Sequence, residues 1–310
     1  MKRRLHRIFA GWLWLGLCWL SCLVSAAPGD AGEPLKVMLI PSDGGTEEGT
    51  RADFAPLFDL LERTTGLEFE IRVGQSYSTV IEALAQGLVD VAYLGTVSFL
   101  SAQERGPVEL LAIGETGESY SYYSGLFTRQ DSGIRTMEDL HGRSLGLSDP
   151  RSSSGFVFPL ALLLEQGFEP LKDFSGIILT GSHSNSLGAM AEGRVEVAAA
   201  PFESYIKAVR QGIIDPRKIH IIAKSAPIPN PPLAINGKLP PELKERIRTA
   251  LHTIHEQPGV RPGTIRGHAG VVLERYNAQV PSALYDRTRE IMAMVDDDLR
   301  VAILKQASER

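Results

Sequence analysis

The feature that most constrains the fold of this chain is a regular alternation between short apolar runs and segments with helical spacing of apolar residues. Residues 35–40 and 89–94 are apolar runs with the length of buried strands. Residues 54–61 carry apolar side chains at the spacing of one helix face, and Gly66 is suited to end that helix. Repeated strand–helix units predict an α/β fold with mainly parallel sheets covered by helices.

The alternation runs through the chain twice, over 35–113 and again over 136–223. Four prolines then crowd residues 227–232, where helix is excluded. A long amphipathic helix is predicted over 241–257. With 310 residues, 43% of them hydrophobic, the chain is long enough to bury the cores of two lobes.

The first 27 residues have the layout of a secretory signal peptide. Four basic residues lie within positions 2–7, an apolar run covers 8–24, and a Val-Ser-Ala-Ala cleavage pattern stands at 24–27. We therefore expect residues 1–27 to be removed on export to the periplasm. The alternatives are an uncleaved membrane anchor and a lipoprotein attached through Cys22.

Removing that segment leaves a mature chain without cysteine or tryptophan, because both cysteines and all three tryptophans lie within it. This excludes disulfides and cysteine-based metal sites from the mature chain. The mature chain has 28 basic and 37 acidic residues, a net charge of −9. Such a charge disfavours nucleic acid as a partner. Any bound anion must be held by local geometry against a repulsive field.

The most informative loop is 149–155, which follows a predicted strand and opens a predicted helix. Ser152, Ser153 and Ser154 precede Gly155, so three hydroxyls and several backbone N–H groups converge at a helix N-terminus. This arrangement favours a bound anion, because the donors point outward and the helix dipole attracts negative charge. One serine would suffice for an ordinary N-cap, and three in a row exceed that need.

Two further loops, 74–79 and 181–186, place polar donors at helix starts. The first carries Ser78, and the second carries His183, which adds positive charge when it is protonated. Glu203 follows another predicted strand and is a candidate to accept a proton-bearing ligand oxygen or to pair with a ligand amine. Its alternative is a solvated acid at a helix start.

The sequence contains neither the Gly-x-Ser-x-Gly turn of serine hydrolases, nor a Walker loop, nor a Gly-x-Gly-x-x-Gly turn. A hydrolase using Ser153, His183 and Glu203 is the catalytic alternative, and it requires the three side chains in hydrogen-bond register. A cluster of donors without a nucleophile turn favours binding. We therefore expect no catalytic residue, no metal site and no cofactor.

Taken together and in order, these motifs resemble the phosphate/phosphite/phosphonate-binding proteins of ABC importers. Residues 77–84 resemble the family's Tyr-led segment before its second helix, and 89–95 resemble the next strand. Residues 152–155 match the family's Ser-Thr-Ser-Gly signature with Ser153 in place of threonine, and 181–183 match its Gly-Ser-His. The resemblance covers nearly all of the mature chain.

The resemblance implies a type II periplasmic-binding fold, with two α/β lobes, two crossing segments and a ligand in the cleft. It places lobe 1 at 28–127 plus 226–310 and lobe 2 at 128–225. It implies capture of a small oxyanion for an inner-membrane ABC permease and its ATPase, by a monomer. The expected ligand-binding side chains, with Ser78 and Glu203 added from the loop patterns, are Tyr77, Ser78, Tyr93, Ser152, Ser153, Ser154, His183 and Glu203.

Three departures from the family pattern leave the identity of the oxyanion open. Thr96 stands where the family has proline, Ser184 replaces an aspartate after the histidine, and Glu203 lies about one position from the family's acidic residue. A sensory protein of the same fold, presenting its closed form to a membrane receptor, is the alternative to a transport role.

Overall fold

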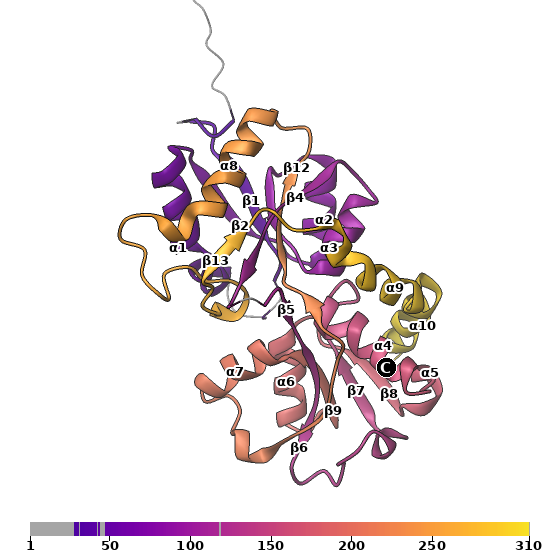
Figure 1. Ribbon diagram of the computed structural model, residues 1–310. Coiled ribbons are helices and arrows are strands. Elements are labelled where there is room, and N and C mark those ends of the chain that lie inside the picture. Colours follow the sequence, from indigo (N-terminus) through magenta and orange to yellow (C-terminus); the bar gives the residue numbers. More distant parts are fainter. Residues whose placement is uncertain (1–27, 31, 42, 44–46, 118, 310) are drawn as a thin grey trace, which may run out of the picture.

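Two α/β lobes, each built around one sheet, make up the described part of the chain (Figure 1). This confirms the predicted fold class.

No helix among the described residues is long and apolar enough to span a membrane. The expectation of a signal peptide over 1–27 falls outside the described residues. The computed structural model describes residues 28–30, 32–41, 43, 47–117 and 119–309.

The first lobe is built on a six-stranded sheet with strand order β13-β4-β12-β3-β1-β2. Leu35, Val37 and Leu39 alternate along β1 and are buried in the core of this lobe. The elements of the lobe are β1 (Leu35–Leu39), α1 (Glu47–Thr65), β2 (Phe69–Val73), α2 (Tyr77–Gln86), β3 (Val91–Tyr93), α3 (Thr96–Gln103), β4 (Val108–Glu115), β12 (Pro232–Asn236), α8 (Pro241–Thr253) and β13 (Arg275–Asn277).

The second lobe is built on a five-stranded sheet with strand order β10-β6-β9-β7-β8. Its strand β9 is buried on both faces, since Val197 and Ala199 face one apolar core and Ala198 and Ala200 face another. The elements of the lobe are β6 (Ser124–Arg129), β7 (Ser144–Leu147), α4 (Phe158–Glu165), α5 (Pro170–Asp173), β8 (Gly176–Leu179), α6 (His183–Ala191), β9 (Val197–Pro201), α7 (Phe202–Arg210) and β10 (Ile219–Lys224).

Each sheet is part parallel and part antiparallel. β1 pairs in parallel with β2 and β3, and β7 pairs in parallel with β8 and β9. β12, β4 and β13 of the first sheet, and β6 and β10 of the second, add antiparallel pairs. The prediction of mainly parallel sheets is therefore wrong, because β6 and β12 enter their sheets from the crossing segments rather than through a strand–helix unit.

The two crossing segments form a short antiparallel ribbon between the lobes. Its strands are β5 (Ser121–Tyr122) and β11 (Ile228–Pro229), in which Ile228 pairs with Tyr122. Thr96 at the start of α3 donates a hydrogen bond to the carbonyl oxygen of Pro229 at 2.7 Å. The ribbon is therefore anchored to the first lobe beside the residues that enter the cleft.

The C-terminal helices α9 (Asp286–Met294) and α10 (Asp297–Ser308) lie beside the second lobe (Figure 1). Ile291, Val295 and Ile303 belong to the apolar core of that lobe, and α10 packs on β8. We therefore propose lobe boundaries that differ from the sequence-based ones in two places. β6 belongs wholly to the second lobe, and so do α9 and α10.

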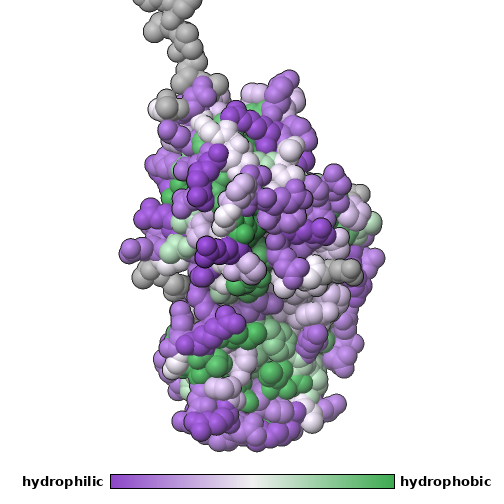
Figure 2. Space-filling model, turned by 60° about the vertical axis from the view of Figure 1, so that its left-hand side comes forward, coloured by the Kyte–Doolittle hydropathy of each residue, from purple (hydrophilic) through white to green (hydrophobic). Residues whose placement is uncertain are grey.

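Apolar side chains gather on the surface of the second lobe, in the lower part of the face shown in Figure 2. Large apolar side chains that this lobe exposes include Ile178, Ile206, Ile213 and Ile221.

Gly106, between α3 and β4, allows α2 to pack closely against this turn. A Cβ at Gly106 would lie 2.1 Å from the carbonyl oxygen of Ala85. We expect Gly106→Ala to lower the free energy of unfolding by about 1–3 kcal/mol, as overpacking does. Gly188, inside α6, has open space at its Cβ position. Gly188→Ala is the matched control and should raise stability by about 0.5–1 kcal/mol. Urea unfolding measures both, and equal stabilities would contradict the packing argument.

Candidate functional site

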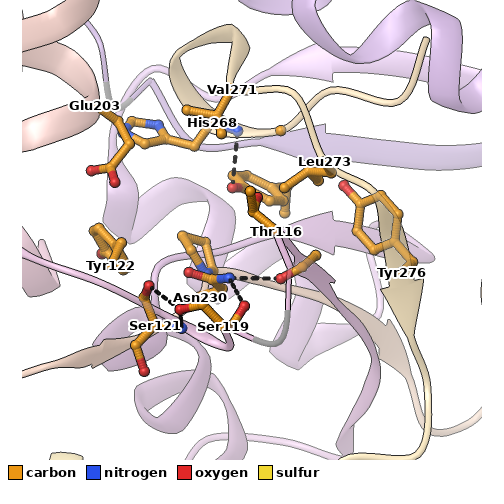
Figure 3. A pocket seen from close by; sticks show the side chains of 14 residues that line it. Thr116, Ser119, Ser121, Tyr122, Glu203, Asn230, His268, Val271, Leu273 and Tyr276 are labelled. Atoms are coloured by element: carbon orange, nitrogen blue, oxygen red, sulfur yellow. Dashed lines mark hydrogen bonds between the residues drawn. The ribbon is translucent and has the colours of Figure 1, made fainter. Parts of the chain in front are cut away.

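Two neighbouring cavities lie between the lobes and share part of their lining. The smaller one is lined by the serine loop and by aromatic side chains of the first lobe. The larger one has a volume of about 180 Å³ and extends along the crossing segments and β13 (Figure 3). Residues that line both cavities are Tyr93, Tyr122, Pro231 and His268.

The serine loop turns from β7 into a short π-helical turn (Ser153–Val157) that continues into α4. Ser152 caps this turn, and its Oγ accepts a hydrogen bond from the Gly155 amide at 3.0 Å. All three serines are about 2% exposed. The ordinary capping role therefore falls to Ser152, and the hydroxyls of Ser153 and Ser154 make other contacts.

Gly155 is required by the closeness of its neighbours. A Cβ there would lie 1.8 Å from Ser148 Oγ and 2.9 Å from His183 Cδ2. Any larger residue would displace the imidazole ring. The glycine of the motif thus fixes the distance between the serine loop and the histidine.

His183 is the first residue of α6 and points at the serine loop. Ser182 caps this helix by accepting from the Asn185 amide. Nε2 of His183 lies 3.1 Å from Ser152 Oγ and 3.5 Å from Ser154 Oγ. The histidine is 3% exposed. One nitrogen of the ring therefore faces the small cavity from within the second lobe.

The first lobe and the crossing segment supply three tyrosines to the small cavity: Tyr77, Tyr93 and Tyr122. Burial raises the pKa of each phenol above its usual range, so all three hydroxyls stay protonated donors at neutral pH. Tyr93 Oη accepts from the His268 amide at 3.2 Å. The Tyr77 hydroxyl is buried and makes no hydrogen bond of normal length with the described residues.

The N-terminus of α3 approaches the serine loop from the opposite lobe. The Val97 amide donates to Ser153 Oγ at 2.9 Å, and Ser98 Oγ donates to the Arg151 carbonyl at 2.9 Å. Gly95, just before α3, lines the small cavity. Helix N-termini from both lobes therefore converge on one point, which favours an anion there.

The larger cavity combines apolar walls with a few polar groups (Figure 3). Val271, Leu273 and Tyr276 form part of its lining. Glu203 also lines it, and burial raises the pKa of this carboxyl. Its Oε2 is buried without a hydrogen-bond partner among the described residues. The Asn230 amide donates to the Gly114 carbonyl at 2.7 Å and holds the cavity edge in place.

A polar cluster joins the lobes beside the cavities. Asp43, in the loop after β1, is 7% exposed and accepts a hydrogen bond from Ser204 of the second lobe at 2.6 Å. Lys207 of the same lobe lies 3.4 Å from Asp43 and 3.1 Å from Asp53 of α1. The contacts of Asp43 with Ser204 and Lys207 form only when the two lobes are together, so the cluster depends on lobe closure.

Opposing effects set the charges of the cluster. Burial alone would raise the pKa of Asp43, but His268, His183 and Lys207 together hold that pKa well below its usual range. Burial alone would lower the pKa of Lys207, but Asp43 and Asp53 keep it above its usual value. Asp43 is therefore ionised and Lys207 is protonated at neutral pH.

Six of the eight side chains expected from sequence line the small cavity: Tyr77, Tyr93, Ser152, Ser153, Ser154 and His183. The other two differ. Ser78 is exposed and lines neither cavity, because successive residues of α2 point in different directions around the helix. Glu203 lines the larger cavity.

Sequence reasoning missed Tyr122, His268 and the cluster of Asp43, Ser204 and Lys207. Tyr122 lies on a crossing strand, and its only sequence signal is the Tyr-Tyr pair before β6. Asp43 and His268 lie 225 positions apart, so no spacing rule connects them.

The chain matches the family model described as "ABC transporter, phosphonate, periplasmic substrate-binding protein" over residues 45–275. It is 27% identical over 230 residues to a phosphate-import protein from Mycolicibacterium smegmatis, covering 70% of each chain. It is 25% identical over 248 residues to the phosphonates-binding periplasmic protein of Escherichia coli, covering 78% of this chain and 72% of that one.

Among solved structures, the binding-protein component of an ABC phosphonate transporter from Pseudomonas aeruginosa superimposes with a TM-score of 0.74. The match has 22% sequence identity and covers 89% of this chain and 95% of the other. This likeness confirms the two-lobed periplasmic-binding fold.

Lys207 is the cation that compensates two carboxylates of the opposite lobe. Lys207→Met keeps much of the aliphatic stem and should destabilise the closed form by about 1–3 kcal/mol, because Asp43 loses a charged partner on closure. We expect a larger radius of gyration by small-angle X-ray scattering. The exposed Lys218 of the same lobe provides the control Lys218→Met. Unchanged scattering from Lys207→Met would contradict a role in closure.

Proposed function

The chain belongs to the family of periplasmic phosphonate-binding proteins of ABC transporters, and on that premise we propose that the small cavity takes the oxyanion group and the larger cavity takes an organic substituent. The observation that carries this proposal is the convergence of Ser152, Ser154 and His183 with the N-terminus of α3 on one point. A phosphonate group presents three oxygens, and this cluster presents several donors.

Neutral donors suit this task in an acidic protein. The mature chain carries a net charge of −9, so long-range attraction does not assist capture of an anion. Hydroxyls and helix N-termini replace the water shell of the anion without adding a buried fixed cation, which would be costly in the absence of ligand. The protonated tyrosines contribute donors in the same way.

Entry of the oxyanion requires a small separation of the lobes. The small cavity measures about 10 Å³, room for about one water molecule. In the closed arrangement His183 Nε2 instead contacts Ser152 Oγ at 3.1 Å. An entering oxygen would displace this contact and accept from both groups, and the lobes would then close on it by hinge rotation.

The size of the larger cavity favours an organic phosphonate over phosphate or phosphite. Its volume of about 180 Å³ exceeds the roughly 150 Å³ of a cavity that holds benzene. It adjoins the small cavity, with which it shares Tyr93 and Tyr122 as lining residues. Glu203 Oε2, buried without a partner among the described residues, favours a substituent that carries an amino or hydroxyl group.

The remaining proposals follow from the family. We propose export directed by residues 1–27 and delivery of the ligand to an inner-membrane permease with its ATPase. The geometry does not favour the hydrolase alternative built on Ser153, His183 and Glu203. Ser153 Oγ accepts from the Val97 amide, and the hydroxyls nearest to His183 Nε2 are those of Ser152 and Ser154.

Ser154→Ala tests the oxyanion site. Losing a hydrogen bond to a charged group costs about 1.5–3 kcal/mol, so we expect affinity for methylphosphonate to fall by roughly 10- to 150-fold in calorimetric titration. The control is Ser78→Ala, an exposed serine outside both cavities, which should bind like the wild type. No binding of methylphosphonate, phosphate or phosphite at millimolar concentration would overturn the oxyanion assignment.

Glu203→Gln tests the substituent cavity. We expect the wild type to bind 2-aminoethylphosphonate more tightly than propylphosphonate, which has a similar size. The ratio of these two affinities should be about tenfold smaller in the variant. Burial raises the pKa of Glu203 in the folded chain, so the carboxylate is costly above that pKa. Glu203→Gln should therefore raise the free energy of unfolding at pH 8 and leave it unchanged at pH 4. An equal preference in both proteins would contradict the role of Glu203.

A further inference from the structure

We propose that Asp43, His183 and His268, with the Ser204 hydroxyl as a fourth ligand, form a binding site for Zn²⁺ or a similar divalent transition metal at the boundary between the lobes. The sequence analysis expected no metal site. The three side chains come from the loop after β1, the start of α6 and the segment before β13.

The geometry of the ligand atoms carries the proposal. Asp43 Oδ1 lies 3.8 Å from His183 Nδ1 and 3.8 Å from His268 Nε2. One ligand atom from each residue lies within 4.8 Å of the others. With two edges of 3.8 Å and a third of at most 4.8 Å, the point equidistant from the three atoms lies no more than about 2.5 Å from each. Small side-chain movements would bring this to the roughly 2.0–2.2 Å bonds of Zn²⁺ to nitrogen and oxygen.

Ser204 Oγ completes the set from the second lobe. It lies 2.6 Å from Asp43 Oδ1, 3.4 Å from His183 Nδ1 and 3.4 Å from His268 Nε2. The hydroxyl therefore faces all three ligand atoms at once. Two imidazoles and a carboxylate are ligands that Zn²⁺ accepts, and the hydroxyl would take the fourth position, which water fills in three-ligand sites. Its hydrogen bond to Asp43 Oδ1 would give way to the metal.

Burial makes this set distinct from a chance surface grouping. The side chains of Asp43, His183 and His268 are 8%, 3% and 10% exposed. Lys207 contacts the other carboxylate oxygen, Oδ2, and so leaves Oδ1 directed at the histidines. It also pairs with Asp53. With neutral imidazoles, the two carboxylates and one ammonium leave a net charge of −1, which a divalent cation reverses.

Each lobe supplies two of the ligands, Asp43 and His268 from the first and His183 and Ser204 from the second. A bound metal therefore favours the closed form, because only closure brings the four groups together. His183 would bind the metal through Nδ1, so its Nε2 would carry a proton and donate toward the serine loop. The metal would thereby strengthen the donor that faces the small cavity.

The test uses the exported chain, purified without a histidine tag and stripped of metal with a chelator. We expect calorimetry to show one Zn²⁺ bound per chain, with a raised thermal unfolding temperature. Asp43→Asn and His268→Gln should each weaken Zn²⁺ binding by at least tenfold to a hundredfold. The exposed His141 supplies the control His141→Gln, which should bind like the wild type. Variants that bind Zn²⁺ as tightly as the wild type would overturn the site.

A second measurement does not depend on the variants folding. Co²⁺ added to the stripped wild type should give the visible absorption of a four-coordinate site, and Zn²⁺ should abolish it by displacement. A six-coordinate Co²⁺ spectrum or the absence of binding would overturn the proposal.

The same stripped protein is titrated with methylphosphonate, and this experiment separates the metal-site proposal from the oxyanion proposal. Phosphonate binding without Zn²⁺ binding rejects the metal site alone, and the reverse rejects the oxyanion site alone.

Discussion

The hydrogen bond from Ser204 to Asp43 is the interaction on which the arrangement of the cleft depends. A carboxylate taken out of water costs free energy unless partners replace its hydration. Here those partners, Ser204 and Lys207, belong to the opposite lobe. Closure therefore exchanges water for these two groups, and opening returns the carboxylate to water. A ligand that binds the closed form more tightly than the open form shifts the balance between them by that difference in affinity.

The cost of burying a charged group without partners also explains which donors line the cleft. A permanent cation buried in the cavity would be costly in the absence of ligand. The donors that face the small cavity are instead hydroxyls, an imidazole and backbone amides. Their partners in the closed form are one another, as with Ser152 and His183. In the proposed site, an oxyanion would replace these weak mutual contacts by charge-assisted ones, which are roughly twice as strong.

The part of the site that sequence predicted is the part built from local loops. Ser152 to Ser154 and His183 stand at strand–helix junctions, where position along the chain determines position at the sheet edge. Ser78 was misplaced because a helix start fixes the capping residue, here Ser76, but leaves the next residues pointing in different directions. Tyr122 and His268 could not be predicted, since the crossing ribbon and the segment before β13 bring them to the cleft through long-range packing. The antiparallel halves of both sheets escaped prediction for the same reason.

His183 links the two sides of the cleft through a ring that has little freedom to move. Its Cδ2 lies against Gly155, where even a methyl group would not fit, and Ser182 fixes the helix start that carries it. The ring of His268 meets it edge-on, with centroids 5.5 Å apart. Nε2 therefore stays directed at the serine loop while Nδ1 stays directed at Asp43. Because the ring cannot turn without displacing Gly155, a change in what Nδ1 binds alters the proton on Nε2 rather than the position of the ring. The proposed capture of an anion and the closure of the lobes would therefore be coupled through this single side chain.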